Sequence, residues 1–402
     1  MRDALPLLPG ATLGVLGGGQ LGRMFVHAAQ RMGYFTAVLD PDPDSPAGRV
    51  SHHHIHADYT DIDGLARLAG LADAITTEFE NVPAPSLEHL AVARPLAPGA
   101  PAVAIAQDRI AEKAHFVRCG VPCAPYAVIA SADQLAAVPD DLLPGILKTA
   151  RLGYDGKGQQ RVRDRAELAA AWEASGGVAC VLEKLLPLEF EASVIVARGH
   201  DGQIVHFPPQ RNLHRDGILA VTEVHGDNMS AALAERAVEA TKSIAQGIDY
   251  VGVLCVEFFV IADKDGEGSL VVNEMAPRPH NSGHWSMDAC DVSQFELQVR
   301  TMAGLPLVAP RQHSPAVMLN LLGDLWFAES DALGESPAVA AAPRWADVLA
   351  LPGVHLHLYG KTEARRGRKM GHLNITGADI ASVRSTADFA AAMLGLPIPL
   401  SE

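Results

Sequence analysis

Two glutamates in neighbouring apolar segments are the residues of this chain that most clearly indicate chemistry. Glu257 is the only charged residue in "VGVLCVEFFVI", and Glu274 interrupts "LVVNEMA" beyond the turn "DKDGEG". A β-hairpin that pairs symmetrically about this turn places Glu257 opposite Glu274, with Cβ atoms about 5 Å apart, although a shift of one residue would separate them. Two such carboxylates repel each other and lose hydration, so they either share a proton or bind a divalent cation. We expect Mg²⁺ there, with a further oxygen from Asn273.

A lysine followed by a glycine-rich loop forms the second candidate site. In "GILKTARLGYDGKGQQRV", Lys148 ends a short apolar strand, and Gly153, Gly156 and Gly158 surround Lys157. A cationic, glycine-rich turn between two strands can hold a triphosphate through backbone N–H groups and a point charge. The loop lacks the GxxxxGK[ST] order of a P-loop and leads into a strand, so a surface hairpin is the alternative. We favour phosphate binding.

A different glycine loop lies near the beginning of the chain. The apolar run "TLGVLG" precedes Gly17, Gly19 and Gly22, which form GxGxxG, and helical spacing follows. The next apolar run, "FTAVLD", ends at Asp40, where a Rossmann domain often has its ribose-binding acid. The pattern predicts a strand, a loop and a helix in a doubly wound parallel sheet. The pattern does not decide whether the loop binds a phosphate or only forms a tight turn.

Acidic residues and histidines follow within the same region. Glu78, Glu80 and Asn81 in "TTEFENVP" lie at a predicted strand end, which in an open parallel sheet faces the ligand crevice. An exposed turn is the alternative. The cluster "HHHIH", residues 52–56, has its imidazoles too close together to face one metal ion. We therefore predict a solvated loop at this cluster.

Basic residues form two groups in the second half of the chain. Arg278, His280 and Asn281 follow the Glu274 strand in "APRPHNSGHW", where they could orient a small anion or stabilise an oxyanion. A second group lies within nine residues near the C-terminus and comprises Lys361, Arg365, Arg366, Arg368 and Lys369. In an acidic chain this group is the expected local anion site. A solvated basic loop is the alternative for Arg365 and Arg366.

Composition limits the class of protein. The chain has 402 residues, is 48% hydrophobic and carries a formal net charge of −15, which disfavours a general nucleic-acid binder. No stretch approaches the ~18 apolar residues of a membrane span, and no secretory signal is recognisable. The five cysteines include no CxxC pair, so we expect a reduced, cytoplasmic protein. The helix predicted from "QDRIAEKAHF" and the prolines after it mark a domain boundary.

The order of these motifs resembles the ATP-grasp superfamily. Almost the whole chain is similar to the N5-carboxyaminoimidazole ribonucleotide synthase family, through "GGGQLGRM", "TTEFENVP", "GYDGKGQ", "NLHRDGI", "NEMAPRPHNSGHW", "SQFELQVR" and "GRKMGHLN". The resemblance implies α/β and α+β architecture in three units. These are a Rossmann-like parallel-sheet domain over residues 1–120, a small ATP-grasp lid over 121–192, and a larger C-terminal domain over 193–402 with the metal site and the basic loop.

The resemblance also implies residue roles. ATP would contact Arg109, Lys148, Gly153, Tyr154, Asp155, Gly156, Lys157, Gly158, Gln159, Glu183, Lys184, Leu185, Leu186, Glu191, His214, Asn273 and Glu274. The ribonucleotide would contact Gln20, Glu78, Asn81, Tyr154, Arg278, Lys361, Arg368 and Lys369. Arg278, His280, Asn281 and Lys361 would be catalytic, and Glu257 and Glu274 would bind Mg²⁺. Arg366 stands where many relatives have proline, which leaves the roles of Arg365 and Arg366 open.

The implied activity is carboxylation of 5-aminoimidazole ribonucleotide by bicarbonate and ATP, through carboxyphosphate, in purine biosynthesis. The implied partners are these small molecules and a second copy in a homodimer, with neither biotin nor NAD as cofactor and neither nucleic acid nor membrane as partner. Two alternatives remain from the sequence. One is another ATP-grasp carboxylate–amine ligase, such as formate-dependent glycinamide ribonucleotide transformylase. The other is an NAD(P)-dependent oxidoreductase, which would leave Glu257, Glu274 and Lys148 unexplained.

Overall fold

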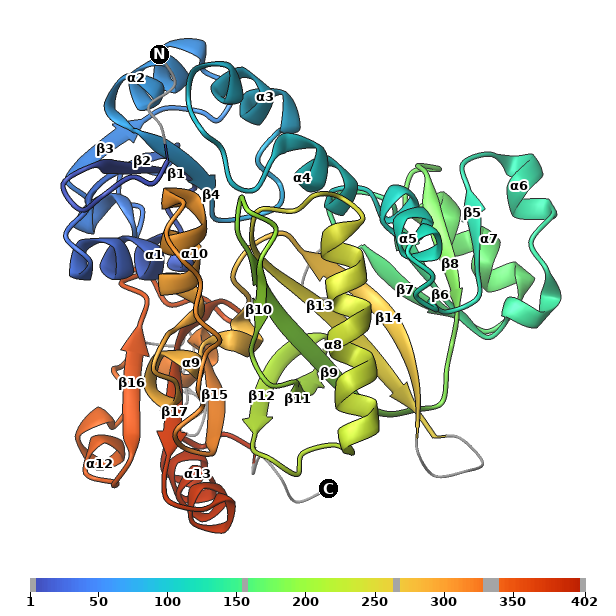
Figure 1. Cartoon of the computed structure of the whole chain (residues 1–402). Coiled ribbons are helices and arrows are strands. Elements are labelled where there is room, and N and C mark those ends of the chain that lie inside the picture. Colours follow the sequence, from blue (N-terminus) through green and yellow to red (C-terminus); the bar gives the residue numbers. More distant parts are fainter. Residues whose placement is uncertain (1–4, 154–157, 263–267, 328–339, 398–402) are drawn as a thin grey trace.

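A four-stranded parallel sheet opens the fold. The computed structural model describes residues 5–153, 158–262, 268–327 and 340–397 (Figure 1). The first sheet has the strand order β3-β2-β1-β4. Its strands are β1 (Thr12–Leu16), β2 (Phe35–Asp40), β3 (His53–His56) and β4 (Ala74–Thr77). The helices of this region are α1 (Gln20–Arg31), α2 (Ile62–Leu71), α3 (Ala84–Ala93) and α4 (Ala100–Ala106), with the 3₁₀ turn η1 (Gly48–Val50).

The predicted strand, glycine loop and helix are confirmed as β1 and α1. Leu13, Val15 and Leu16 of β1 are fully buried, because a parallel strand is covered on both faces. The prediction of a loop at residues 52–56 is wrong, since His53–His56 form β3 parallel to β2. Ile55 packs in the core while its neighbours His54 and His56 are more accessible, so the segment follows the alternation of a strand.

A small antiparallel sheet follows the helix α5 (Arg109–Arg118), whose N-terminus is capped by the Asp108 side chain. We call this unit the lid sheet; its strand order is β5-β8-β6-β7. Its strands are β5 (Tyr126–Ile129), β6 (Gly145–Thr149), β7 (Gln159–Val162) and β8 (Cys180–Lys184). The helices α6 (Ala132–Ala136) and α7 (Arg165–Ala174) and the turn η2 (Asp140–Leu142) lie among them. The predicted turn after Lys148 therefore connects two antiparallel strands, β6 and β7.

The central sheet has nine strands in the order β14-β13-β9-β11-β12-β15-β17-β16, with β10 paired to β9. Its strands are β9 (Leu188–Arg198), β10 (Ile204–His206), β11 (Gln210–Arg215), β12 (Ile218–Val224), β13 (Gly252–Ile261), β14 (Ser269–Ala276), β15 (Ala316–Leu322), β16 (Val354–Leu358) and β17 (Lys369–Thr376). The strand β9 crosses the expected boundary at residue 192, since it begins at Leu188 and pairs with β13.

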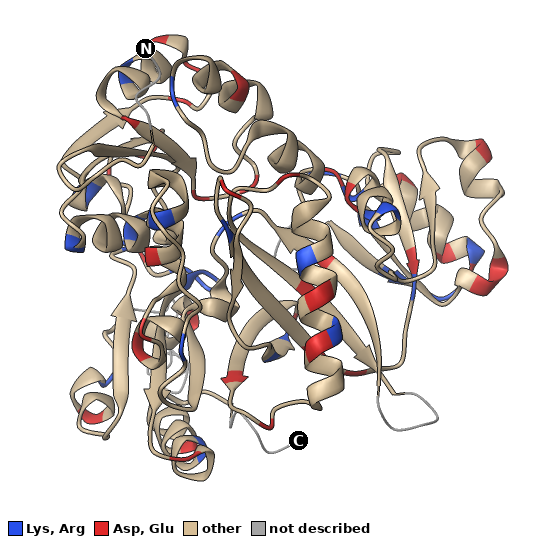
Figure 2. Ribbon diagram, in the orientation of Figure 1, with Lys and Arg blue, Asp and Glu red and all other residues tan. Residues whose placement is uncertain are grey.

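Helices cover the central sheet and connect it to the first sheet. They are α8 (Ala231–Gln246), α9 (Ser286–Ala289), α10 (Gln294–Ala303), α12 (Trp345–Leu349) and α13 (Ile380–Leu394), with the turns η3 (Asn281–Gly283) and η4 (Gly323–Trp326). Acidic and basic residues are interspersed along α8 in Figure 2, whereas its Ala237 and Val238 pack with β9 and β13. In α10, Phe295 and Val299 pack with the first sheet, and Leu297 packs with β9. Thus α10 fixes the two sheets relative to each other.

None of the helices in the described part of the chain is both long and apolar enough to cross a membrane.

Candidate active site

The β13–β14 hairpin brings the two glutamates opposite each other, as predicted. The register differs from the symmetric one, because Phe258 pairs with Val272 rather than with Asn273. A β-bulge between the Phe258–Val272 pair and the Glu257–Glu274 pair inserts Asn273 as an extra residue of β14. The prediction of symmetric pairing is therefore wrong near the turn. The bulge restores the expected juxtaposition of the glutamates.

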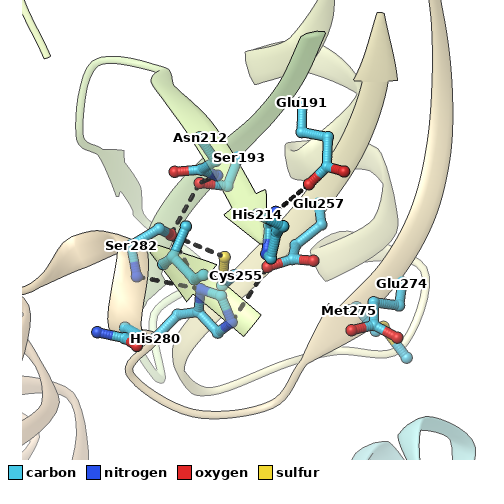
Figure 3. A network of polar contacts seen from close by, with 12 residues as sticks. Glu191, Ser193, Asn212, His214, Cys255, Glu257, Glu274, Met275, His280 and Ser282 are labelled. Carbon is cyan, nitrogen blue, oxygen red and sulfur yellow. Dashed lines mark hydrogen bonds and ion pairs between the residues drawn. The ribbon is translucent and has the colours of Figure 1, made fainter. Parts of the chain in front are cut away.

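Each glutamate of the pair has a partner of its own. The Glu274 carboxylate accepts from Arg109 Nη1 at 3.0 Å, and Glu257 Oε1 lies 3.2 Å from His280 Nε2 (Figure 3). Burial and the nearby Glu274 carboxylate raise the pKa of Glu257. Burial opposes ionisation of Glu274, but Arg109 and Lys148 together outweigh it and lower the pKa of that carboxyl. The pair is therefore electrostatically strained, and a divalent cation would relieve the repulsion.

The donor set fits Mg²⁺ when phosphate oxygens complete it. Among the described residues there is no cluster of three or more histidines, cysteines and carboxylates that could hold a metal alone. Mg²⁺ is commonly bound by one or two carboxylates together with nucleotide phosphates and water. The two glutamates and the neighbouring Asn273 oxygen match that pattern.

Lys148 belongs to a buried row of charges. Its Nζ lies 3.1 Å from Glu183 Oε2 and 3.3 Å from Asn273 Oδ1, and Lys113 Nζ lies 3.0 Å from the other Glu183 oxygen. The three charged side chains are at most 7% exposed. Burial opposes ionisation of Glu183, but Lys148 and Lys113 outweigh it and lower its pKa. Burial lowers the pKa of Lys148, which Glu183 partly offsets. Glu183 thus holds Lys148 in the wall of the space beside the glutamate pair.

That space is a cavity of 770 Å³ between the lid sheet and the central sheet, which we call the lid cavity. Most residues expected to contact ATP line it, namely Arg109, Lys148, Gln159, Glu183, Lys184, Leu185, Leu186, Glu191, His214, Asn273 and Glu274. His214 Nδ1 contacts the Glu191 carboxylate, and hydrogen bonding to Glu191 raises the pKa of His214 against the effect of burial. Residues Tyr154, Asp155, Gly156 and Lys157 of the predicted loop lie outside the described residues.

A second cavity of 610 Å³ lies between the first sheet and the central sheet, and we call it the glycine-loop cavity. The residues expected to contact the ribonucleotide or bicarbonate line it, namely Gln20, Glu78, Asn81, Arg278, His280, Asn281, Lys361, Arg368 and Lys369. Gly153 also lines this cavity rather than the lid cavity, and Gly158 (φ +72°) receives a bond from Thr149 N through its carbonyl. Arg365 and Arg366 are exposed and line neither cavity.

The two cavities share a wall. Six residues line both: Arg109, Glu257, Glu274, His280, Asn281 and Lys369. The wall contains the glutamate pair and two of the residues expected to be catalytic. Groups bound in the two cavities would therefore meet at the glutamate pair.

The first glycine loop is occupied by carboxylates of the chain itself. Glu78 accepts from the backbone N–H groups of Gly19 at 2.6 Å and Gly22 at 2.8 Å, and Asp40 accepts from Gly18 N–H at 2.6 Å. A Cβ on Gly19 would lie 2.4 Å from a Glu78 oxygen, so the loop and the carboxylate need glycine to approach each other. The amides that a dinucleotide pyrophosphate would use are already bonded. The loop is thus a tight, self-capped turn at this site.

The segment after β14 presents an arginine, a neutral histidine and an amide. Arg278 pairs with Glu80, and His280 Nδ1 lies 2.9 Å from Ser282 Oγ. Burial and the nearby Arg278 lower the pKa of His280 well below its usual range. Asn281 exchanges two hydrogen bonds with Asn320, at 3.1 and 2.6 Å. This array offers hydrogen-bond donors and one positive charge to a small anion.

Sequence reasoning missed several side chains that support the site. Lys113 and Glu112 lie one turn of α5 beyond Arg109, a spacing that could have revealed Lys113. Gln294 lies in a motif that supported only the resemblance, and His284 lies in "APRPHNSGHW", where only Arg278, His280 and Asn281 were given a role. Their contacts join segments distant in sequence, so only the folded chain reveals them.

Comparison with family models covers most of the chain. Residues 10–107 match the ribonucleotide synthetase preATP-grasp domain, residues 114–295 the ATP-grasp domain, and residues 316–386 the phosphoribosylaminoimidazole carboxylase C-terminal domain. N5-carboxyaminoimidazole ribonucleotide synthase of Brucella melitensis biotype 1 is 43% identical over 374 residues, covering 92% of this chain and 98% of the relative. The chain belongs to the N5-carboxyaminoimidazole ribonucleotide synthase family.

Solved structures of the synthase family share the whole fold. N5-carboxyaminoimidazole synthetase from Staphylococcus aureus, complexed with ADP, has a TM-score of 0.85 at 38% identity and covers 98% of this chain and 100% of that chain. The Aspergillus clavatus synthase, in complex with ADP and 5-aminoimidazole ribonucleotide, has a TM-score of 0.85 at 29% identity, covering 97% and 100%. The expected ATP-grasp fold, ATP use and ligase class are thereby confirmed. As a member of the synthase family, this chain is an ATP-dependent carboxylating enzyme of purine biosynthesis.

Proposed function

We propose how the synthase reaction is distributed over the two cavities of this chain. ATP binds in the lid cavity, 5-aminoimidazole ribonucleotide binds in the glycine-loop cavity, and bicarbonate is activated at their shared wall. The products are N5-carboxyaminoimidazole ribonucleotide, ADP and phosphate. The observation that supports this arrangement is the wall of six residues common to both cavities.

In the lid cavity, cationic side chains bind the phosphates of ATP. Lys148 and Arg109 offset phosphate charge, and residues Gly153 to Gln159 contribute further contacts to the phosphates, as the family resemblance implies. Glu183 to Leu186 line the adenine, since Glu183 and Lys184 end β8 and Leu185 and Leu186 follow where the chain passes to β9 of the central sheet, all four lining the lid cavity. Glu191 accepts from ribose hydroxyls, and His214 orients Glu191 through their direct contact.

In the glycine-loop cavity, the basic residues near the C-terminus bind the 5′-phosphate of the ribonucleotide. Lys361, Arg368 and Lys369 line this cavity, whereas the amides of the first glycine loop are bonded to Glu78 and Asp40. Gln20, Glu78, Asn81 and Tyr154 surround the remainder of the ribonucleotide. The phosphate of the ribonucleotide is thus bound by side chains rather than by the GxGxxG turn.

His280 and Asn281 of the shared wall, together with Arg278 of the glycine-loop cavity, orient bicarbonate. A bicarbonate oxygen attacks the γ-phosphorus of ATP, which yields carboxyphosphate and ADP, and the amine of the ribonucleotide then takes the carboxyl group with release of phosphate. Neutral His280 can donate or accept a hydrogen bond without adding charge. No residue needs to act as a covalent nucleophile, so positioning and electrostatics provide the acceleration.

Glu257 and Glu274 would hold Mg²⁺, which when bound neutralises charge on the phosphates. Bound Mg²⁺ would also remove the repulsion between the two carboxylates. Further parts of the proposal rest on the family resemblance alone. They are a cytoplasmic homodimer without biotin or NAD, with neither nucleic acid nor membrane as partner, and a division into units 1–120, 121–192 and 193–402.

The test is ADP release by the purified protein with ATP and Mg²⁺, with bicarbonate and the ribonucleotide added separately and together. We expect turnover only when the ribonucleotide is present, and labelled bicarbonate trapped in an acid-labile product. ATP turnover that is indifferent to the ribonucleotide would refute the placement of this substrate. Mg²⁺ titration in the same assay, with Glu257→Gln beside Glu274→Gln, tests the metal ligands.

A further inference from the structure

A second histidine of the segment "PRPHNSGHW" lines the glycine-loop cavity. His284 is 1% exposed, and its side chain lies among the residues that line this cavity together with Arg278 and Lys369. Nothing above gives it a role in the reaction. Its environment fixes both its position and its protonation state.

Gln294, the first residue of α10, forms hydrogen bonds with the backbone of this segment at His280. The Gln294 side chain is fully buried, its Oε1 accepts from His280 N–H at 2.9 Å, and its Nε2 donates to His280 O at 2.8 Å. A backbone N–H can only donate and a backbone carbonyl can only accept, so the amide of Gln294 has one possible orientation. Its Nε2 also lies 3.0 Å from His284 Nδ1.

The orientation of Gln294 determines the tautomer of His284. Since Gln294 Nε2 carries only donor hydrogens, His284 Nδ1 must accept and cannot carry a proton. The neutral ring therefore carries its proton on Nε2. Burial and neighbouring basic groups also lower the pKa of His284 well below its usual range. Among the described residues, His284 Nε2 has no hydrogen-bond partner, and His284 lines the glycine-loop cavity.

A row of rings from His372, His357 and Tyr359 packs beside His284. The His372 ring lies 4.7 Å from the His284 ring and stacks on His357 at 4.6 Å. His357 Nε2 lies 2.7 Å from Asp288 Oδ2, and Tyr359 Oη lies 2.9 Å from His372 Nδ1. These contacts leave the His284 ring little freedom to rotate. The ring is thus held on one side by Gln294 and on the other by His372.

We propose that His284 is a further substrate-binding residue of the carboxylation reaction, a neutral imidazole that donates Nε2–H to an anionic oxygen in the glycine-loop cavity, and that Gln294 is the positioning residue that sets its tautomer. The oxygen belongs either to the carboxyl unit derived from bicarbonate or to the ribonucleotide. The inference rests on the proposed placement of substrates, except for the tautomer, which is independent of it.

The kinetic test compares two variants of His284. His284→Phe keeps a ring but removes the donor, and His284→Gln keeps an N–H close to the position of Nε2. We expect His284→Phe to lower kcat/KM by about 10- to 100-fold, the range for a hydrogen bond to a charged group, and His284→Gln to lower it by less than about tenfold. KM for ATP should stay within about twofold, because ATP binds in the other cavity.

The substrate whose KM rises in His284→Phe is the one that carries the oxygen bound by His284. A rise for bicarbonate alone indicates the carboxyl unit, and a rise for the ribonucleotide alone indicates that substrate. Equal losses in kcat/KM for His284→Phe and His284→Gln, or a parallel rise in KM for ATP, would overturn the substrate contact and leave a structural role. Thermal unfolding of both variants shows whether each is folded.

The tautomer is measured directly on the wild-type protein with ¹⁵N-labelled histidine. We expect His284 Nδ1 to be unprotonated and Nε2 to be protonated from pH 6 to 8, with the signals identified by their loss in His284→Gln. Gln294→Met should allow both tautomers and raise the same KM as His284→Phe. A protonated Nδ1 in the wild type would overturn the inference. Absence of ribonucleotide-dependent turnover in the wild type would instead refute the proposed function while leaving the tautomer result intact.

Discussion

Replacing Lys113 by methionine tests whether the buried charge row controls Lys148. The change removes one of the two ammonium groups that neutralise Glu183, while the methionine keeps most of the apolar volume of the lysine stem. Lys113 is 1% exposed, so the remaining carboxylate gains no compensation from water. Among the described residues, Lys148, 3.1 Å from Glu183, is then the one cation that remains ion-paired with this carboxylate.

The size of the effect follows from burial. Removing one partner of a buried ion pair costs about 3–5 kcal/mol, and retention of Lys148 places this case at the lower end, about 3 kcal/mol. Lys148 also becomes more firmly bound to Glu183 and less able to contact phosphate. We expect KM for ATP to rise about tenfold, which corresponds to about 1.4 kcal/mol, with KM for the ribonucleotide unchanged.

The assay combines urea unfolding with ATP titration of ADP release. Lys242→Met is the matched control, because Lys242 pairs with Glu239 at 2.8 Å on the exposed side of α8. We expect that control to cost less than about 1 kcal/mol and to leave KM for ATP unchanged. The double variant Lys113→Met/Glu183→Gln should be more stable than Lys113→Met, since it removes the uncompensated carboxylate.

A stability of Lys113→Met equal to that of Lys242→Met would refute the reasoning. So would an unchanged KM for ATP in a folded Lys113→Met variant. Either result would mean that Glu183 is neutralised by Lys148 alone.

Three further changes test other parts of the site. Glu274→Gln should raise the Mg²⁺ concentration for half-maximal ADP release about tenfold or more, and an unchanged Mg²⁺ titration would contradict a metal role. Glu78→Gln should lower the free energy of unfolding by about 1 kcal/mol, as for loss of a helix cap, without creating NADH binding in a fluorescence titration. Arg384 and His225 together outweigh burial and keep the pKa of Glu223 low; because the Arg384 side chain is 45% exposed, Arg384→Met should cost about 2 kcal/mol at pH 7, below the range for a fully buried pair. That cost should shrink as the pH falls through the folded-state pKa of Glu223, because protonation of Glu223 removes the same interaction from the wild type. If the difference in free energy of unfolding between the wild type and Arg384→Met, measured in urea, does not change with pH, the expectation is contradicted.

Local patterns predicted the elements that carry the site. The glycine turn before α1, the lysine strand β6 and the hairpin β13–β14 each depend on residues close in sequence, and each is present in the fold. The alternation at residues 52–56 was overlooked because histidine is a weak indicator of strand, whereas the buried Ile55 fits the strand period.

Long-range contacts could not be predicted. The bulge at Asn273 depends on how β14 fits the central sheet, and a symmetric hairpin gave the correct glutamate pair only because this bulge compensates the register. Glu78 reaches the first glycine loop across about 60 residues of chain, as its bond to Gly19 shows. Gln294, in α10, reaches His280, which precedes the turn η3. Such polar contacts depend on the packing of whole sheets, for which the sequence has no short-range signal.

Many cationic side chains at this site form ion pairs with carboxylates of the chain, and the shared wall explains why. In the described part of the chain, Arg109 is bonded to Glu274, Arg278 to Glu80, and Lys148 to Glu183. A cation paired in this way is already in position and partly desolvated, so exchanging its carboxylate for a substrate oxygen needs little reorganisation. Carboxyphosphate is destroyed by water, so it has to be formed and consumed without crossing solvent. A single wall between the two cavities meets that requirement, because His280 and Asn281 line both cavities.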